Sequence, residues 1–298
     1  MLKVKRKGNE KMATFYNQAT LIFDGSSTTS NVTEGELLVG ISGTKTALTA
    51  DYVRDGIITY GISIVNSGAV SENNITVTDN LGSYTPVGLS APVTPLEYID
   101  GSVLLYINGS PALAPTVTLG EGSITFSGIN LAPGENAFLI YETRANEFAP
   151  LASGDSITNT ASIGAAAPIE AVTDTATVPV RDWTSLTIAK AVCPGVITDN
   201  GEITYTFIIQ NTGNTPADAT DNVVIADTFA PILSNITVTL DGTPLTEGVG
   251  YTYNETTGEF RTIEGAIPVP AATFTQNSDT GAIGVVPGVT VITVTGTV

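Results

Sequence analysis

The sequence predicts an all-β fold with two tandem β-sandwich domains, and three observations carry that prediction. The chain has 298 residues, which is enough for two domains of ordinary size. Its composition is 42% hydrophobic and 13% charged, which supports buried cores rather than disorder. Short segments rich in Thr and branched aliphatic residues are bounded by Gly, Asn, Asp or Pro, at a spacing typical of sandwich strands.

Residues 1–12 form a basic leader. They carry five of the 11 basic residues of the chain: Lys3, Lys5, Arg6, Lys7 and Lys11. No apolar stretch follows these charges, so the segment does not resemble a secretory signal peptide. Because the leader also lacks a β pattern, we expect it to be mobile or to lie outside the sandwich cores.

Residues 13–36 are predicted to form an N-terminal donor strand followed by a linker. Strand alternation places every second side chain of this segment on one face. That face is the more apolar one apart from its asparagine, and it consists of Phe15, Asn17, Ala19, Leu21 and Phe23. The run Asn17-Gln-Ala-Thr also resembles Asn159-Thr-Ala-Ser in the last predicted strand of the first domain.

Residues 37–181 are predicted to be the first domain and residues 182–298 the second, because the sequence contains an internal repeat. ITYGISIVNSG at 58–68 and ITYTFIIQNTG at 203–213 match at six of eleven positions, at an offset of 145. A lysine precedes each block at the same offset, and an apolar run ending in Asp follows each block.

The second domain is expected to lack its own last strand, since nothing before Val298 corresponds to the strand ITNTASI at 157–163. An open sheet edge of this kind favours pairing with another strand. We predict that the N-terminal segment of a neighbouring copy supplies it, which gives a head-to-tail homopolymer. Two alternatives stay open: residues 13–36 add a strand to the first domain, or they close the second domain within the same chain.

The pattern Lys, TYxIxxxNxG, VxDxL and IxNxA resembles a repeat of bacterial and archaeal surface proteins, a conserved domain of unknown function, the eleventh so named. The two-copy size, acidic body and missing signal peptide resemble the ribbon proteins of clostridial spore appendages. These resemblances imply immunoglobulin-like sandwiches in a structural subunit of an extracellular filament on a cell or spore surface. They also allow for other appendage subunits as partners.

The two copies each carry one lysine, Lys45 and Lys190, and no other lysine follows residue 11. One interpretation is an ordinary ion pair at a strand end. The other is an autocatalytic isopeptide bond, which needs a buried Lys, a buried carboxyl group and an Asn on the last strand. The candidate sets are Lys45, Asp79 and Asn159 within one domain, and Lys190, Asp227 and Asn17 of a neighbour.

Charge and residue counts weigh against several function classes. The net charge is −18, which disfavours nucleic acid as a partner. The chain has no His and no set of catalytic or phosphate-binding motifs, so we expect no enzyme, no metal site and no cofactor. No stretch is long enough to span a membrane. Cys193, the single cysteine, is interpreted as a structural residue or as an intermolecular disulfide partner. The alternative function is a monomeric surface adhesin or ligand-binding module, including a calcium-dependent one.

Overall fold

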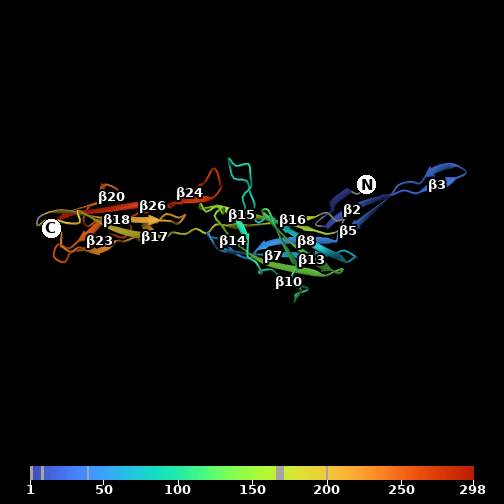
Figure 1. Cartoon of the computed structure of the whole chain (residues 1–298), viewed down its shortest axis with the longest axis horizontal. Coiled ribbons are helices and arrows are strands. Elements are labelled where there is room, and N and C mark those ends of the chain that lie inside the picture. The colour runs from blue at the N-terminus through green and yellow to red at the C-terminus, as the bar shows by residue number, and fades with distance from the viewer. Residues whose placement is uncertain (1–2, 8–9, 39, 166–170, 199–200) are drawn as a thin grey trace. The chain divides into compact units, whose positions relative to one another are not determined.

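The computed structural model describes residues 3–7, 10–38, 40–165, 171–198 and 201–298. The predicted all-β fold is confirmed: strands run through the described chain, and its single helical element is the 3-10 turn η1, Ala219–Asp221 (Figure 1). The chain divides into two compact units. Unit 1 comprises Met1–Ala149 and Ile157–Pro179, and unit 2 comprises Pro150–Ser156 and Val180–Val298.

Unit 1 contains two large antiparallel sheets, besides the smaller ones of its N-terminal segment described below. The first has the order β11-β10-β14-β7-β6, with β9 also paired to β14, and the second has the order β12-β13-β8-β15-β16. The strands of the first sheet are β6 (Ile41–Ala47), β7 (Ile57–Asn66), β9 (Leu96–Tyr98), β10 (Leu104–Ile107), β11 (Ser110–Pro111) and β14 (Asn136–Ala145). The strands of the second are β8 (Glu72–Asp79), β12 (Thr116–Gly120), β13 (Ser123–Leu131), β15 (Ser156–Gly164) and β16 (Val172–Pro179).

Unit 2 repeats the first sheet with the order β17-β18-β26-β20-β21, and its second sheet is shorter, β19-β23-β22. A separate hairpin joins β24 to β25. The strands are β17 (Leu186–Cys193), β18 (Glu202–Asn211), β19 (Ala226–Thr228), β20 (Ser234–Leu240), β21 (Thr243–Pro244), β22 (Tyr251–Tyr253), β23 (Glu259–Thr262), β24 (Thr273–Gln276), β25 (Ile283–Val286) and β26 (Gly288–Thr297).

Strand alternation builds both cores. Along β7, Ile58, Tyr60, Ile62 and Ile64 have no exposed surface, because every second residue of the repeated block points inward. The equivalent residues of β18 contribute to the core of unit 2, together with Phe229 and other buried side chains. The apolar positions that identified the repeat are therefore core positions.

The asparagine and glycine that close each repeated block are structural. Asn66 is fully buried, and its Nδ2 donates to the carbonyls of Val70 and Leu131 at 2.8 and 3.0 Å. Its Oδ1 accepts from the amide of Gly68 at 3.0 Å. Asn211 of unit 2 accepts in the same way from Gly213 at 2.9 Å. The N-x-G signature therefore satisfies buried backbone groups around a turn.

The N-terminal segment differs from the expected leader, strand and linker. β1 (Lys3–Lys7), β2 (Glu10–Asn17) and β5 (Thr33–Leu38) form one antiparallel sheet, and β3 (Thr20–Phe23) pairs with β4 (Ser26–Thr29). Residues 1–12 therefore include strands, because backbone pairing does not require an apolar face. Residues 13–36 fold back on themselves at Asp24 and Gly25, whose φ angles of 47° and 72° are those of a type I′ hairpin turn. We call residues 10–38 the N-terminal hairpin.

The two units are equivalent strand for strand in their first sheets. Lys45 of β6 lies opposite Ile62 of β7, and Lys190 of β17 lies opposite Phe207 of β18. Both residues of the second pair follow their counterparts in the first pair by 145 positions. The second sheets differ. In unit 1 β8 has β13 on one side and β15 on the other, whereas in unit 2 β19 pairs with β23 alone. No helix within the described residues is long and apolar enough to cross a membrane.

Candidate functional site

Lys45 lies within the sandwich of unit 1, on β6. Its Nζ forms an ion pair with Oδ2 of Asp79, and neither side chain has any exposed surface. The ammonium group also lies 4.6 Å from the ring centroid of Tyr60. Burial lowers the pKa of Lys45 from 10.5 to about 8, even though the Asp79 carboxylate opposes that shift. A larger fraction of neutral amine is therefore present than on an ordinary lysine.

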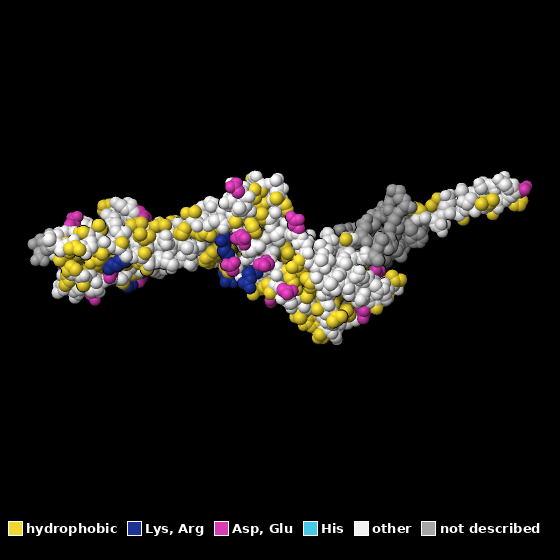
Figure 2. Space-filling model, in the orientation of Figure 1, with side chains coloured by type: hydrophobic (Ala, Val, Ile, Leu, Met, Phe, Trp, Pro, Cys, Tyr) yellow, Lys and Arg dark blue, Asp and Glu magenta, His cyan; other side chains and the backbone are white. Residues whose placement is uncertain are grey.

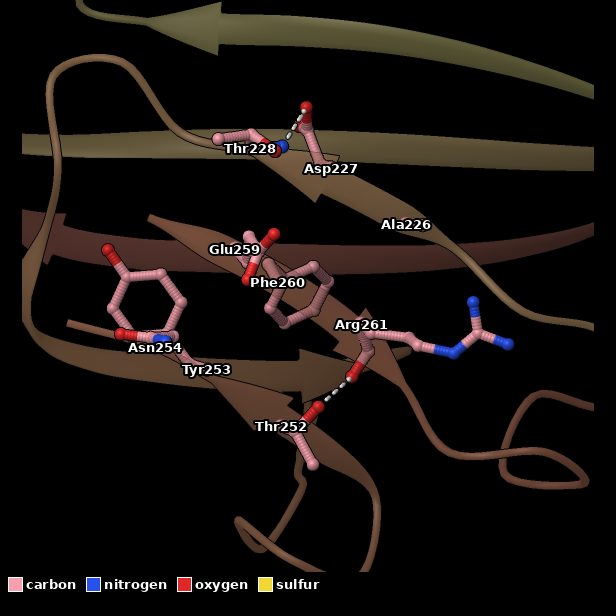
Figure 3. A pocket seen from close by; sticks show the side chains of 9 residues that line it. All are labelled: Ala226, Asp227, Thr228, Thr252, Tyr253, Asn254, Glu259, Phe260 and Arg261. Atoms are coloured by element: carbon pink, nitrogen blue, oxygen red, sulfur yellow. Dashed lines mark hydrogen bonds between the residues drawn. The ribbon is translucent and has the colours of Figure 1, made fainter. Parts of the chain in front are cut away.

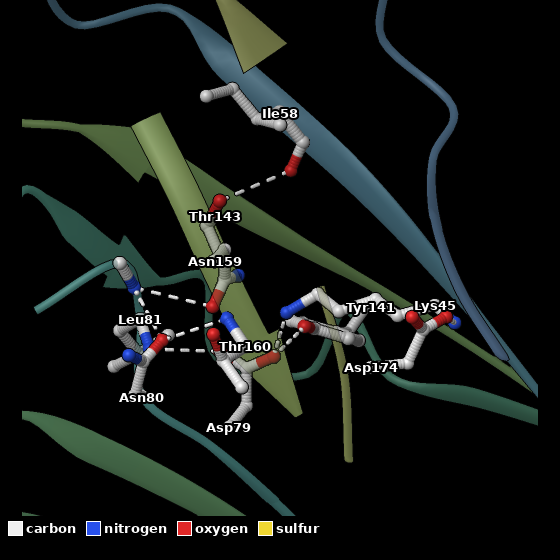
Figure 4. Close-up of polar contacts among 11 residues, drawn as sticks. Lys45, Ile58, Asp79, Asn80, Leu81, Tyr141, Thr143, Asn159, Thr160 and Asp174 are labelled. Carbon is white, nitrogen blue, oxygen red and sulfur yellow. Dashed lines mark hydrogen bonds and ion pairs between the residues drawn. The ribbon is translucent and has the colours of Figure 1, made fainter. Parts of the chain in front are cut away.

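Asp79 ends β8 and is held by three donors (Figure 4). Its Oδ1 accepts from the backbone amide of Leu81 at 2.8 Å. Its Oδ2 accepts from both the Lys45 ammonium and the Tyr141 hydroxyl. Burial, together with the nearby Asp79 carboxylate, raises the pKa of Tyr141 well above its usual value, so this hydroxyl stays a donor.

Asn159 reaches the same place from β15 and is fully buried. Its Oδ1 accepts from the amide of Gly82 at 3.2 Å, which polarises the side-chain carbonyl. In the described part of the chain, neither its Nδ2 nor the buried Tyr60 hydroxyl makes a hydrogen bond of ordinary geometry, although Asn159 lies close enough to the Tyr60 and Tyr141 hydroxyls to affect their pKa values. An unsatisfied buried amide costs on the order of 1–3 kcal/mol. The structure thus brings the predicted set Lys45, Asp79 and Asn159 into one buried cluster.

The second predicted pair is built in the same way but is open. Lys190 Nζ forms an ion pair with Asp227 Oδ2, with 39% and 20% of the two side chains exposed. The ammonium lies 4.5 Å from the ring centroid of Tyr205, as Lys45 lies beside Tyr60. The strand register places Val294 opposite Tyr205, where unit 1 has Tyr141 opposite Tyr60. Asp227 therefore lacks a counterpart of the Tyr141 hydroxyl.

A groove of about 660 Å³ runs past Asp227 on the second sheet of unit 2 (Figure 3). The groove is lined by three consecutive residues from each of three strands, β19, β22 (with Asn254 just after its end) and β23. They are Ala226, Asp227, Thr228, Thr252, Tyr253, Asn254, Glu259, Phe260 and Arg261. The carboxylate of unit 2 is thus accessible from solvent, whereas that of unit 1 is sealed.

The proposed donor residues lie in the N-terminal hairpin. Phe15 and Asn17 belong to β2, Ala19 follows it, and Leu21 and Phe23 belong to β3. Leu21 and Phe23 are 64% and 76% exposed, and Figure 2 shows hydrophobic side chains on this hairpin at its right-hand end. Whether these residues enter a neighbouring copy stays a prediction.

Sequence reasoning missed three groups of the unit 1 site. Tyr60 stands inside the repeated block and has a counterpart in Tyr205, so the repeat could have revealed it. Tyr141 has no aromatic counterpart in unit 2, where Val294 takes its position, so a comparison of the two copies does not identify it. Gly82 acts through its backbone amide, for which residue type gives little signal.

No family model and no curated protein matches the sequence, so the two family resemblances are not confirmed. Solved structures do match. The major pilin subunit BcpA of Bacillus cereus is 14% identical, with a TM-score of 0.38 over 92% of this chain and 73% of that one. The full-length major pilin SpaD from Corynebacterium diphtheriae is 9% identical, with a TM-score of 0.34 over 93% and 70%. Similarity at this level carries no argument about function.

Proposed function

We propose that the chain is a non-enzymatic structural subunit of an extracellular filament on a cell or spore surface. Copies join head to tail when the N-terminal segment of one copy completes unit 2 of the next. The joints are then locked by bonds between lysine and asparagine side chains. The acidic surface of such a protein favours solubility outside the cell.

One observation carries this proposal: the same lysine–aspartate pair is sealed in unit 1 and open in unit 2. In unit 1 the seal is β15, which pairs with β8 so that Ala161 lies opposite Asp79. In the described part of unit 2, no strand pairs with the free side of β19. A free edge beside an exposed charge pair is a binding site for an added strand.

The N-terminal segment has the residue pattern that this position requires. In β15 the inward side chains are Ile157, Asn159, Ala161 and Ile163, and all four are buried. Residues 15–21 read Phe-Tyr-Asn-Gln-Ala-Thr-Leu, with an apolar residue, Asn, Ala and an apolar residue at the same spacing. Asn17 would thus stand next to Lys190 and Asp227 of the recipient, as Asn159 stands next to Lys45 and Asp79.

The cluster in unit 1 has the groups needed to form an isopeptide bond. Neutral Nζ of Lys45 attacks Cγ of Asn159, the Nζ–Cγ bond forms, the Cγ–Nδ2 bond breaks, and one ammonia leaves. Asp79 accepts a proton from Nζ and returns one to Nδ2. The amide of Gly82 supports the negative charge that develops on Oδ1. The departure of Nδ2 also removes an unsatisfied buried donor.

Electron microscopy of the purified chain tests the proposal, since filaments are expected. Deleting residues 1–24 should abolish them, and a free peptide of residues 13–24 should block assembly of the full chain. Deleting only residues 1–9 is the matched control and should leave assembly intact. Normal filaments from the chain that lacks residues 1–24 would rule out donor-strand exchange.

A further inference from the structure

Unit 1 has two strands without counterparts in the described part of unit 2. The first is β15, beside β8. The second is β16, which lies along β6: Asp174 of β16 accepts from the backbone amide of Lys45 at 2.7 Å. In the described part of unit 2, β19 therefore has one unpaired side, and no strand lies along β17 as β16 lies along β6.

The exposure of β17 shows what the absence of a β16 counterpart means. Ile41 at the start of β6 is 3% exposed, whereas Leu186 at the same position of β17 is 38% exposed. Ile188 and Val192 on β17 are 58% and 45% exposed. In unit 1 Ile163 of β15 lies against Gly43, the counterpart of Ile188, so a single donor strand beside β19 would cover only part of this edge and leave the position of β16 empty.

The N-terminal hairpin has the same pairing as the β15–β16 hairpin. The hydroxyls of Thr158 and Thr177 meet across β15 and β16 at 3.1 Å. Aligning Asn17 with Asn159 places Tyr16 at the position of Thr158, and Tyr16 pairs with Glu34 across β2 and β5. Glu34 therefore corresponds to Thr177, and the two hairpins correspond in both strands.

The order along the chain repeats as well. β16 ends at Pro179 and leads into β17 of unit 2, which begins at Leu186. In the same way β5 ends at Leu38 and leads into β6 of unit 1, which begins at Ile41. Each hairpin thus directly precedes the first strand of a sandwich, and the β15–β16 hairpin completes the sandwich before it.

We infer that the complete hairpin of residues 10–38, not one strand, docks into unit 2 of a second copy. The strand of residues 14–22 lies along β19, and the strand of residues 29–36 lies along β17, as β15 and β16 do in unit 1. The inference rests on the proposed head-to-tail assembly and names the element that performs it.

Pre-pairing makes a hairpin a better donor than a single strand. Its two strands already satisfy each other's backbone groups, so less conformational entropy is lost on docking. Because an isolated two-stranded hairpin is only marginally stable in water, docking onto a sandwich should also stabilise the hairpin itself. Leu21 and Phe23 at its end are 64% and 76% exposed and gain burial from docking.

The single cysteine provides a probe of this register. In unit 1, Lys45 contacts Asp174 and the amide of Tyr52 donates to the carbonyl of Pro179 at 3.0 Å, so β16 and β6 run in the same direction. Counting along both strands between these two contacts places Leu48 level with residues 176–177. Cys193 occupies the position of Leu48 in unit 2, at the offset of 145. The hairpin counterparts of residues 176–177 are 33–34.

Single cysteines are therefore introduced into the full chain across the second hairpin strand, as Val32→Cys, Thr33→Cys, Glu34→Cys and Gly35→Cys. Filaments are assembled, oxidised and run on a non-reducing gel. At least one variant should link to Cys193 of the next copy and give a ladder that Cys193→Ser abolishes. Leu113→Cys, at a position 92% exposed, is the control and should give no ladder. Amide exchange in residues 186–193 of wild-type filaments should be about tenfold or more slower than in unassembled protein.

The outcomes separate the two proposals. Filaments that show neither a cysteine ladder nor protection of residues 186–193 overturn hairpin docking and leave head-to-tail assembly standing. A wild-type chain that forms no filaments overturns the proposed function, and the hairpin inference with it. If the cysteine variants do not assemble, protection of residues 186–193 in wild-type filaments decides the question.

Discussion

At the scale of single residues, Lys45 is held in a position that disfavours its own charge. Its amine lies buried in the core with one carboxylate partner and an aromatic face, and its pKa falls to about 8. A buried ion pair adds little net stability by itself, because desolvation of both charges offsets their attraction. The proposed role of Lys45 as a nucleophile would use this lowered pKa.

The first prediction concerns the mass of the chain. If Lys45 and Asn159 are joined, intact-mass spectrometry should find the folded protein lighter by one ammonia. Lys45→Ala should restore the full mass and lower the melting temperature, because the bond closes a long loop and restricts the unfolded chain. Lys190→Ala is the matched control and should keep the deficit in the unassembled protein. A folded wild-type chain of full mass would contradict the covalent bond.

The second prediction concerns pH. In Asn159→Ala the amine of Lys45 stays free, with a pKa of about 8 when folded and 10.5 when unfolded. The unfolded chain then binds more protons in this window, so the free energy of unfolding should rise from pH 8 to pH 10. The full effect is on the order of 3 kcal/mol, at about 1.4 kcal/mol per pKa unit.

Urea unfolding at a series of pH values measures this rise. The window stops at pH 10 because burial raises the pKa values of Tyr60 and Tyr141, which makes stability fall again at higher pH. Adding Lys45→Met to Asn159→Ala should flatten the profile. The wild type should also be flat if its amine is already in an amide. A flat profile for Asn159→Ala alone would show that Lys45 is not desolvated as described.

The unit 1 site could be predicted from the sequence only in part. Lys45, Asp79 and Asn159 carry side-chain chemistry and stand at repeated positions, so residue types and spacing were enough to group them. The positions of Tyr141 and Gly82 depend on the register between strands distant in sequence, which a single sequence does not specify.

At the scale of strands and turns, the packing around the glycine that closes the second repeated block shows why that position excludes other residue types. A Cβ on Gly213 would stand 2.2 Å from the carbonyl oxygen of Trp183 and 2.8 Å from Cα of Thr184. Both neighbouring atoms belong to the backbone, so no change of side-chain rotamer can make room for the added methyl group. The segment that enters unit 2 therefore packs directly against the end of β18.

The third prediction follows from this contact. Gly213→Ala should destabilise unit 2 by at least about 1–3 kcal/mol, because the methyl group overpacks the backbone. Gly195→Ala is the control in the same unit, since its Cβ meets no atom within 4 Å. The control should be neutral or slightly stabilising. Thermal unfolding of both variants measures the difference, and equal stability of the two would refute the close packing.

The N-terminal hairpin is the element that sequence reasoning described least well. The alternation in residues 14–23 predicts one strand, whereas the structure has two, β2 and β3, with a break at Gln18 and Ala19, and the predicted linker contains the turn at Asp24-Gly25. This dipeptide tolerates the positive φ angles of a tight hairpin, so it was a usable signal. The strand at Lys3–Lys7 had no such signal, since its residues are mostly charged and only backbone pairing defines it.

At the scale of the whole molecule, charge is distributed unevenly along the chain. Residues 1–12 carry a net charge of +4, and the rest of the chain carries −22. In the proposed head-to-tail assembly, the basic leader of one copy would approach the acidic body of another, and their attraction would favour the encounter at low salt. The positive leader precedes the hairpin in the chain, so its attraction to the negative body of the next copy would bring the hairpin close to its proposed docking site.

The last prediction concerns the covalent joint between copies. Docking of the hairpin should bury Lys190 and Asp227, which are now 39% and 20% exposed, and bring Asn17 beside them. The amine then enters the kind of dry setting that lowers the pKa of Lys45, and an amide bond can form with release of ammonia. Wild-type filaments boiled in SDS should therefore give a ladder of covalent multimers.

Two substitutions should separate docking from bonding in this experiment. Lys190→Arg keeps the positive charge but removes the amine nucleophile, so its filaments should assemble and then dissolve to single chains in SDS. Lys45→Arg is the matched control: it loses the bond within unit 1 and should keep the ladder. A ladder that persists in Lys190→Arg would place the crosslink elsewhere. Wild-type filaments that dissolve completely would show that docking alone holds the copies together.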